Sequence, residues 1–184
     1  MPGSKHLKTK ICLVGEGAVG KTSLIRRHVL DKFEDGYLQT IGTKVSKKTL
    51  RIVRPNGGSV VRVDMTIWDI MGQLQFRELL RDAYFIGTHG ILAVADLTRR
   101  ETLDGLYVWI DRVDRVVSQL PVVLVVNKAD LGRDAKFGEA EMARAAKAFN
   151  TEYLMTSAKT GANVEEAFQR LGVLVAERQL FKEG

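Results

Sequence analysis

A glycine-rich stretch near the N-terminus carries the residue types that bind phosphate. Residues 15–22 read GEGAVGKT, which matches the pattern G-x-x-x-x-G-K-T. Glycines at this spacing let the backbone curl so that successive N–H groups point into one concavity, which suits anionic oxygens. Lys21 would place a positive charge on the terminal phosphates, and the Thr22 hydroxyl can join the coordination shell of Mg²⁺. We therefore predict a nucleotide-phosphate site here, and we disfavour the alternative of a glycine-rich turn without a ligand.

A second stretch with suitable chemistry is DIMGQ at residues 69–73. The carboxylate of Asp69 can hold Mg²⁺ through its water shell. The backbone N–H of Gly72 can approach a terminal phosphate, and the side chain of Gln73 can orient an attacking water. Because the pattern D-x-x-G is common, this stretch indicates a nucleotide site only in combination with the phosphate loop.

Two stretches further along the chain suit a guanine base. In NKAD (residues 127–130), the carboxylate of Asp130 can accept bonds from the N1–H and 2-amino groups, which adenine lacks. Adenine would leave this charge without partners, so discrimination on the order of 10⁴ or more is expected. Lys128 can lay its aliphatic stem along the ring. In TSAK (residues 156–159), the backbone N–H of Ala158 can donate to guanine O6. A polar strand-to-helix turn is the alternative interpretation of NKAD.

The elements that must position these stretches alternate between strands and helices. Continuous apolar runs, typical of strands buried in a parallel sheet, lie at 10–14, 91–95, 122–126 and 153–155. Apolar residues recur at helical spacing in 21–30, 103–117, 142–149 and 164–174. The β-rich runs 43–53 and 59–69 flank the turn sequence PNGG, which indicates a hairpin.

This alternation predicts an α/β fold of the P-loop NTPase class. We expect a mostly parallel six-stranded sheet with one antiparallel edge strand and five helices on both faces, one more than the four helical patterns found above. Ligands of such sheets bind at the carboxyl ends of the strands, and all four stretches fall there. The basic side chains of the first hairpin strand are interpreted as protection of a sheet edge, with partner docking as the rival interpretation. They are Lys44, Lys47, Lys48, Arg51 and Arg54.

Composition indicates an ordinary single-domain protein. The chain has 184 residues, of which 45% are hydrophobic and 27% charged. It contains no apolar run of the roughly 18 residues that a membrane span needs, no export leader and no visible lipid-anchor signal. Cys12 is the single cysteine, so we expect a cytoplasmic protein in which Cys12 is a core residue. The net charge of +6 permits anionic partners, but the aromatic–basic interleaving of single-strand binders is missing and no nucleic-acid partner is expected.

In their order and spacing, the four stretches resemble those of the Ras superfamily of small GTPases, over about residues 8–181. The resemblance implies GTP or GDP as ligand, Mg²⁺ as cofactor, and two nucleotide-sensitive switch loops at about 34–42 and 69–82. It places Phe33 beside the guanine and Tyr37 in the first switch. It also implies that Thr40 contacts Mg²⁺ and the γ-phosphate. The implied organisation is a flexible tail over residues 1–7 and a single G domain over 8–184.

The predicted site residues take three roles. The catalytic residues are Gln73, Lys21 and Thr40. The metal ligands are Thr22, Thr40 and Asp69. The nucleotide-binding residues are Gly15, Gly17, Ala18, Val19, Gly20, Lys21, Thr22, Ser23, Phe33, Tyr37, Thr40, Gly72, Asn127, Lys128, Asp130, Ser157, Ala158 and Lys159.

Several features bear on the branch of the family. Trp68 before the aspartate, and the short stretch between Asp130 and Ser157, favour a Rab-like protein. Ile70 and Met71 depart from the usual Thr-Ala of the second switch and add bulk to it. Together with the missing C-terminal cysteine, such departures fit a prokaryotic member or a chain whose tail has been removed.

The predicted function is a molecular switch that hydrolyses GTP to GDP and phosphate. No arginine is in an evident position to reach the γ-phosphate from within the chain, so we expect slow intrinsic hydrolysis that a GTPase-activating partner accelerates. Exchange and effector proteins are also expected. One alternative is a nucleotide-dependent binding module with little hydrolysis, held in one state by Ile70 and Met71. The other is a P-loop phosphotransferase or ATPase, which the NKAD stretch disfavours. The three histidines, His6, His28 and His89, show no metal-ligand spacing and are set aside.

Overall fold

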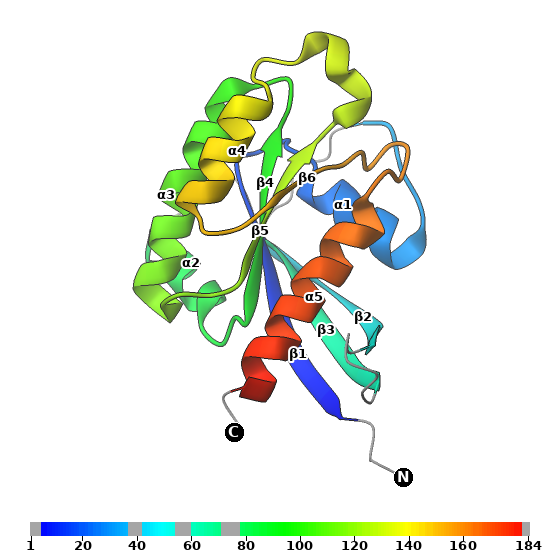
Figure 1. Cartoon of the computed structure of the whole chain (residues 1–184), viewed down its shortest axis with the longest axis vertical. Coiled ribbons are helices and arrows are strands. Elements are labelled where there is room, and N and C mark those ends of the chain that lie inside the picture. The colour runs from blue at the N-terminus through cyan, green and yellow to red at the C-terminus, as the bar shows by residue number, and fades with distance from the viewer. Residues whose placement is uncertain (1–4, 37–41, 54–59, 71–77, 182–184) are drawn as a thin grey trace.

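The structure is a computed structural model that describes residues 5–36, 42–53, 60–70 and 78–181. A central sheet carries helices on both of its faces (Figure 1). Within these residues, six strands lie in the order β2-β3-β1-β4-β5-β6. The strands are β1 (His6–Val14), β2 (Thr43–Val53), β3 (Val60–Ile70), β4 (Gly90–Asp96), β5 (Val122–Asn127) and β6 (Tyr153–Met155). Only β2 is antiparallel to its neighbour, which confirms the predicted sheet.

Five α-helices cover the two faces of the sheet, as predicted, among the residues that the structure describes. They are α1 (Lys21–Leu30), α2 (Glu78–Phe85), α3 (Arg100–Val117), α4 (Glu139–Ala148) and α5 (Val164–Phe181). One core cluster joins the sheet to α1 and α5, and the other joins it to α2, α3 and α4. The 3₁₀ helix η1 (Ala129–Asp134) was not predicted, because it is too short to show a periodic pattern.

The register of the sheet brings the strand ends to one edge. Leu13 of β1 lies opposite Asp69 of β3, and Asp96 of β4 lies opposite Asn127 of β5. Val126 pairs with Met155, so β6 ends beside β5. The phosphate loop, Asp69 at the end of β3, and the NKAD and TSAK stretches after β5 and β6 therefore meet at the carboxyl edge of the sheet. Residues 71–73 of the second stretch lie outside the described residues.

The N-terminal strand is longer than its apolar run. β1 begins at His6, so residues 6 and 7, which the sequence assigns to a flexible tail, belong to the strand. His6 pairs with Arg62 of β3, and its Nε2 lies 2.6 Å from a carboxylate oxygen of Asp64. This part of β1 is partly exposed and polar, so a prediction based on apolar runs did not include it in the strand.

Two expectations about the sheet are met in the described residues. β2 is one of the two edge strands, as expected, and its side chains Lys44 and Lys47 are exposed, which fits both edge protection and partner docking. Cys12 is fully buried, and burial raises the pKa of its thiol to about 11, so it is an inert core residue. The predicted hairpin turn at 54–58 lies outside the described residues.

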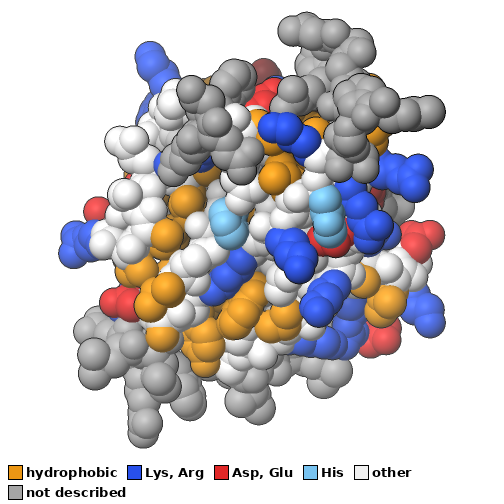
Figure 2. All heavy atoms as spheres, turned by 90° about the horizontal axis from the view of Figure 1, so that it is seen from below, with side chains coloured by type: hydrophobic (Ala, Val, Ile, Leu, Met, Phe, Trp, Pro, Cys, Tyr) orange, Lys and Arg blue, Asp and Glu red, His pale blue; other side chains and the backbone are white. Residues whose placement is uncertain are grey.

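Viewed from below, Lys and Arg side chains gather beside hydrophobic ones (Figure 2). No helix among the described residues is long and apolar enough to cross a membrane.

Candidate functional site

The phosphate loop runs from the end of β1 to the start of α1, and two of its positions require glycine. Gly15 has a φ of 142°, and a Cβ there would lie 2.2 Å from the Val94 carbonyl oxygen. Gly20 has a φ of 103°, and a Cβ there would lie 2.2 Å from the Asn127 amide nitrogen. The loop therefore packs closely against β4 and β5, and it delivers the positive end of the α1 dipole to the site.

Lys21 is a buried cation at the first position of α1. Its Nζ donates to the carbonyl oxygens of Gly15 and Glu16, each at 2.8 Å. Burial lowers the pKa of Lys21 to about 8; the carboxylates of Asp69 and Glu16 oppose this shift and the charge of Arg99 adds to it. An anionic ligand at this position would favour the charged form, so the electrostatics suit a phosphate group.

Thr22 and Asp69 meet where β3 ends beside α1. The Thr22 hydroxyl donates a hydrogen bond to the Asp69 carboxylate, and the Asp69 side chain is buried. Hydroxyl and carboxylate oxygens are ligands that Mg²⁺ prefers, and Mg²⁺ commonly takes one or two carboxylates and completes its shell with waters and phosphates. No group of three or more His, Cys, Asp or Glu side chains in the described part of the chain could hold a metal by itself. The residues present therefore fit a magnesium ion that is shared with a nucleotide.

Asn127, the last residue of β5, joins the phosphate loop to the TSAK stretch. Its amide Nδ2 donates to the Val19 carbonyl oxygen at 3.0 Å. Its Oδ1 accepts from the backbone N–H of Ala158 at 3.1 Å and from the Thr156 hydroxyl at 3.2 Å. Side-chain amides offer both donors and an acceptor, so a single buried asparagine fixes both segments.

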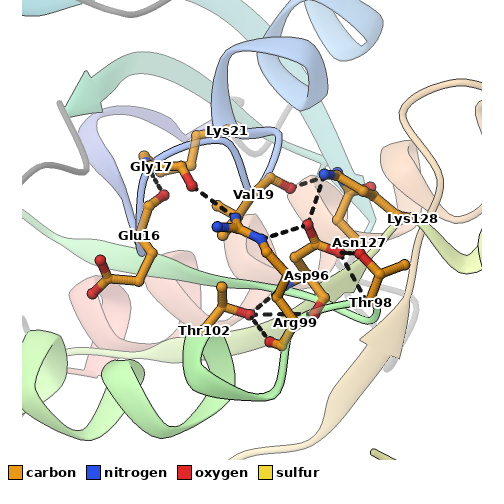
Figure 3. Close-up of polar contacts among 10 residues, drawn as sticks. All are labelled: Glu16, Gly17, Val19, Lys21, Asp96, Thr98, Arg99, Thr102, Asn127 and Lys128. Atoms are coloured by element: carbon orange, nitrogen blue, oxygen red, sulfur yellow. Dashed lines mark hydrogen bonds and ion pairs between the residues drawn. The ribbon is translucent and has the colours of Figure 1, made fainter. Parts of the chain in front are cut away.

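The two stretches predicted to bind the base are also bonded to each other. The Ser157 hydroxyl donates to Asp130 Oδ1 at 2.6 Å and accepts from the Thr160 N–H at 3.1 Å. Lys128 adopts a left-handed backbone conformation with a φ of 68°, and its Nζ lies 2.7 Å from the Asp96 carboxylate. Asp130 and Lys128 thus hold defined positions at the carboxyl edge of the sheet (Figure 3 shows the Lys128 contact).

One predicted donor already has an acceptor. The backbone N–H of Ala158, which the sequence assigns to guanine O6, is bonded to Asn127 Oδ1. Donation to a base would require this bond to be shared or exchanged. The sequence pattern cannot reveal this, because it does not show where the Asn127 side chain points.

Asp96 and Arg99 are site residues that the sequence analysis missed. Asp96 ends β4 with its side chain almost fully buried, and it accepts hydrogen bonds from the N–H and hydroxyl of Thr98. Arg99 donates from Nε to Asp96 at 3.1 Å and from Nη2 to the Gly17 carbonyl oxygen at 2.7 Å. A signal existed for Asp96, because it is a charged residue that ends a buried apolar run at the ligand edge, like Asp69. Arg99 had no comparable signal.

A second arginine, on α1, donates hydrogen bonds to backbone carbonyls of the TSAK turn. Arg27 Nε donates to the Ala158 carbonyl oxygen at 2.9 Å, and its Nη2 donates to the Lys159 carbonyl oxygen at 2.6 Å. The helix that begins at the phosphate loop therefore also holds the base-side turn. The residues lie more than 130 positions apart in the sequence, so no local pattern could indicate the contact.

The remaining predicted residues divide into two groups. Ser23 follows Thr22 in α1, and Phe33 is partly buried against the core cluster of α1 and α5. Four predicted residues lie outside the described residues and stay predictions. They are Tyr37, Thr40, Gly72 and Gln73.

Comparison with known proteins places this geometry in a family. Residues 10–177 match the Ras family, which covers most of the chain and every described motif. The chain belongs to the Ras family. The resemblance drawn from the four stretches is thereby confirmed at the level of the family.

Similar Ras-family relatives come from animals and plants. The chain is 36% identical to the Ras-related protein Rab-4A of Rattus norvegicus over 162 residues, which cover 88% of the chain and 71% of the relative. It is 34% identical to the Ras-related protein RABD2c of Arabidopsis thaliana over 171 residues, covering 92% and 81%. It is 32% identical to the GTP-binding protein YPTM1 of Zea mays over 167 residues, covering 90% and 77%. The names support the Rab-like prediction, and a prokaryotic origin is without support.

Proposed function

We propose that this Ras-family protein is a guanine-nucleotide switch that hydrolyses GTP to GDP and phosphate. The observation that carries the proposal is the set of bonds made by Asn127, which ties the phosphate loop at Val19 to the base-side turn at Ala158. One ligand with a phosphate end and a purine end fits two segments held together in this way. The comparison with GTP-binding and Rab proteins supports the same assignment.

The described residues divide the work of binding. The phosphate loop and Lys21 would hold the phosphates, with positive charge already fixed before the reaction. Asp130, oriented by Ser157, would accept from the N1–H and 2-amino groups of guanine. Lys128, anchored by Asp96, would lie along the ring. Thr22 and Asp69 would hold Mg²⁺, which would neutralise charge on the β- and γ-phosphates when bound.

The catalytic and switching roles fall on predicted residues outside the described part. Gln73 is proposed to orient the attacking water, and Thr40 and Gly72 to contact the γ-phosphate. Loss of that phosphate would release both switch segments and with them the bound effector. We further propose a single G domain, a cytoplasmic location, and regulation by exchange and GTPase-activating proteins.

The first test is the identity of the nucleotide. The purified protein should retain GDP or GTP, and unlabelled GTP but not ATP should displace it. Retention of adenine nucleotides with equal affinity would contradict the guanine assignment and favour an ATPase or phosphotransferase.

The second test is hydrolysis. Single-turnover phosphate release should proceed at about 10⁻⁴ to 10⁻² s⁻¹, and Gln73→Leu should slow it further. Identical rates for the two proteins would remove Gln73 from the mechanism and favour the nucleotide-dependent binding module. A rate of hundreds per second would contradict the proposal of a partner-accelerated switch.

A further inference from the structure

A charged bridge links the phosphate loop to Lys128 of the NKAD stretch (Figure 3). At one end, Arg99 Nη2 donates to the Gly17 carbonyl oxygen at 2.7 Å. In the middle, Arg99 Nε donates to Asp96 Oδ2 at 3.1 Å. At the other end, Lys128 Nζ lies 2.7 Å from the same carboxylate oxygen. The chain of contacts therefore runs from Gly17 through Arg99 and Asp96 to Lys128.

The bridge is held rigidly by the turn between β4 and α3. The backbone N–H and hydroxyl of Thr98 both donate to Asp96 Oδ1, at 2.9 and 2.7 Å. The Thr102 hydroxyl accepts from the Asp96 N–H at 2.9 Å and donates to the Arg99 carbonyl oxygen at 2.6 Å. The planar guanidinium can donate in two fixed directions at once, so it suits a bridge between a carbonyl and a carboxylate.

The bridge also places the charge of Arg99 beside the phosphate loop. The side chain of Asp96 is only 1% exposed, and its single negative charge is shared by Arg99 and Lys128. Lys21 adds a third cation to the same region, and the carboxylates of Asp69 and Glu16 also act on it. The nearby carboxylates therefore balance these cations, and what Arg99 contributes is a guanidinium held against the loop at the Gly17 carbonyl oxygen.

Given the proposed nucleotide function, on which this step rests, we propose that Arg99 is a positioning residue for the phosphate end of the nucleotide. It holds the phosphate loop through the Gly17 carbonyl and adds fixed positive charge next to Lys21, and both effects slow nucleotide release. It acts through the loop, so it is distinct from a group that contacts the reacting atoms.

The test compares the dissociation rates of labelled GDP and GTP from four proteins: wild type, Arg99→Ala, Arg99→Lys and Arg100→Ala. Arg99→Ala should release both nucleotides at least about tenfold faster, which corresponds to the loss of one charge-assisted hydrogen bond. Arg99→Lys keeps the charge, but its single ammonium group replaces the planar guanidinium that donates to both the Gly17 carbonyl and the Asp96 carboxylate. It should therefore give a dissociation rate between those of wild type and Arg99→Ala. Arg100 is the matched control, because its ion pairs go to Asp104 and Glu141 away from the phosphate loop, and its loss should leave release unchanged.

The dependence on salt separates a charge role from a purely structural one. Raising the NaCl concentration should accelerate release from wild type more than from Arg99→Ala, because the variant has lost a charge that salt screens. Parallel salt dependences, or an Arg99→Lys protein as fast as Arg99→Ala, would overturn the charge role. Equal rates for Arg99→Ala and wild type would overturn the whole inference.

Two further controls keep the outcomes distinguishable. If wild type retains neither GDP nor GTP, the proposed function fails. If wild type retains nucleotide and Arg99→Ala releases it at the same rate, only the proposed role of Arg99 fails. Thermal unfolding of the nucleotide-free proteins shows whether each variant is folded. If Arg99→Ala is unfolded, Arg99→Gln, which keeps most of the side-chain length without the charge, takes its place with the same tenfold expectation.

Discussion

The two ends of the proposed nucleotide site are held by different kinds of interaction. At the base end, Asn127, Thr156 and backbone groups bond to one another through neutral donors and acceptors. Asp130, Lys128 and Arg27 add charged contacts around this neutral centre. At the phosphate end, the contacts involve charges: Lys21 donates to backbone carbonyl oxygens, and Arg99 joins Gly17 to Asp96. The centre of the base end is therefore a set of neutral bonds around Asn127, whereas the centre of the phosphate end is the buried charge of Lys21.

This difference indicates at which end the stability of the protein depends on a bound ligand. Neutral hydrogen bonds that are complete without a ligand contribute to the stability of the empty protein. A buried cation destabilises the empty protein until an anion approaches, because burial disfavours the charged form. Loss of the Asn127 bonds at the base end should thus damage the fold, whereas loss of the Lys21 charge at the phosphate end should damage affinity with little loss of stability.

The largest expected effect concerns base specificity. Asp130→Asn should remove the guanine preference, so that the ratio of GDP to ADP affinity falls from about 10⁴ to near one. Competition binding measures the ratio, and circular dichroism melting should show an intact fold. Asp134→Asn, an exposed change in the same 3₁₀ helix, is the control. A variant that still prefers GDP by more than about a hundredfold would contradict the role of Asp130.

The next effect isolates affinity from stability at the phosphate end. Lys21→Ala should weaken GDP binding by about 3 kcal/mol, more than a hundredfold, because it removes a charged donor to the phosphates. Urea unfolding of the nucleotide-free variant should show no loss of stability, since a buried charge is removed with it. Lys32→Ala, at an exposed position just after α1, should change neither quantity. A large loss of stability in Lys21→Ala would break the comparison.

The matching experiment at the base end measures the stability of Asn127→Ala. Asn127→Ala removes bonds to Val19, Thr156 and Ala158 and leaves their buried groups without this partner. The free energy of unfolding of the nucleotide-free protein should fall by about 2–4 kcal/mol. Urea unfolding beside Lys21→Ala measures the contrast directly. Equal stabilities of the two variants would show that the ends do not differ in this way.

The smallest effect is a pH dependence away from the two ends of the site, where His28 in the last turn of α1 stacks on Phe168 of α5 at 3.9 Å between ring centroids. Burial lowers the pKa of His28 below its ordinary value of 6.5, against the opposing effect of the Glu165 carboxylate; Lys48 of β2 acts in the same direction as burial. Below about pH 6.5 the unfolded chain binds a proton that the native state resists, so stability falls as the pH drops.

The loss has an upper limit of about 1.4 kcal/mol per pH unit. Unfolding in urea at pH 7.5 and 5.5 should show a steeper loss for wild type than for His28→Phe, which retains a ring against Phe168 but cannot titrate. Parallel losses in the two proteins would exclude His28 as the origin.

The sequence predicted the parts of this molecule that depend on periodicity and strand order. The apolar runs at 91–95 and 122–126 gave buried parallel strands, and the topology then brought Asn127 and the phosphate loop together. The helical spacing of 21–30 matched α1 to the residue. These features follow from local patterns and from the rule that ligand sites lie at strand carboxyl ends.

What the sequence could not predict depends on side-chain direction over long separations. Arg99 contacts Gly17 across 82 positions, and no pattern distinguished Arg99 from the neighbouring Arg100. The same applies to Arg27, and to His28, which the sequence set aside and which the structure buries against α5. The sequence predicted that the Ala158 N–H donates to a base, and it could not show that this N–H is bonded to Asn127 Oδ1.

The placement of the two tryptophans has a practical consequence. Trp109 of α3 is buried, and its indole N–H donates to the Glu16 carboxylate of the phosphate loop at 3.2 Å. Gly105 makes room for that carboxylate, since a Cβ there would lie 2.9 Å from it. Trp68 immediately precedes Asp69 in β3 and lies under the Lys10 ammonium group. Trp109 therefore contacts the phosphate loop directly, whereas Trp68 is only the chain neighbour of Asp69. The fluorescence of Trp109 should consequently change when a ligand binds to or leaves the phosphate loop.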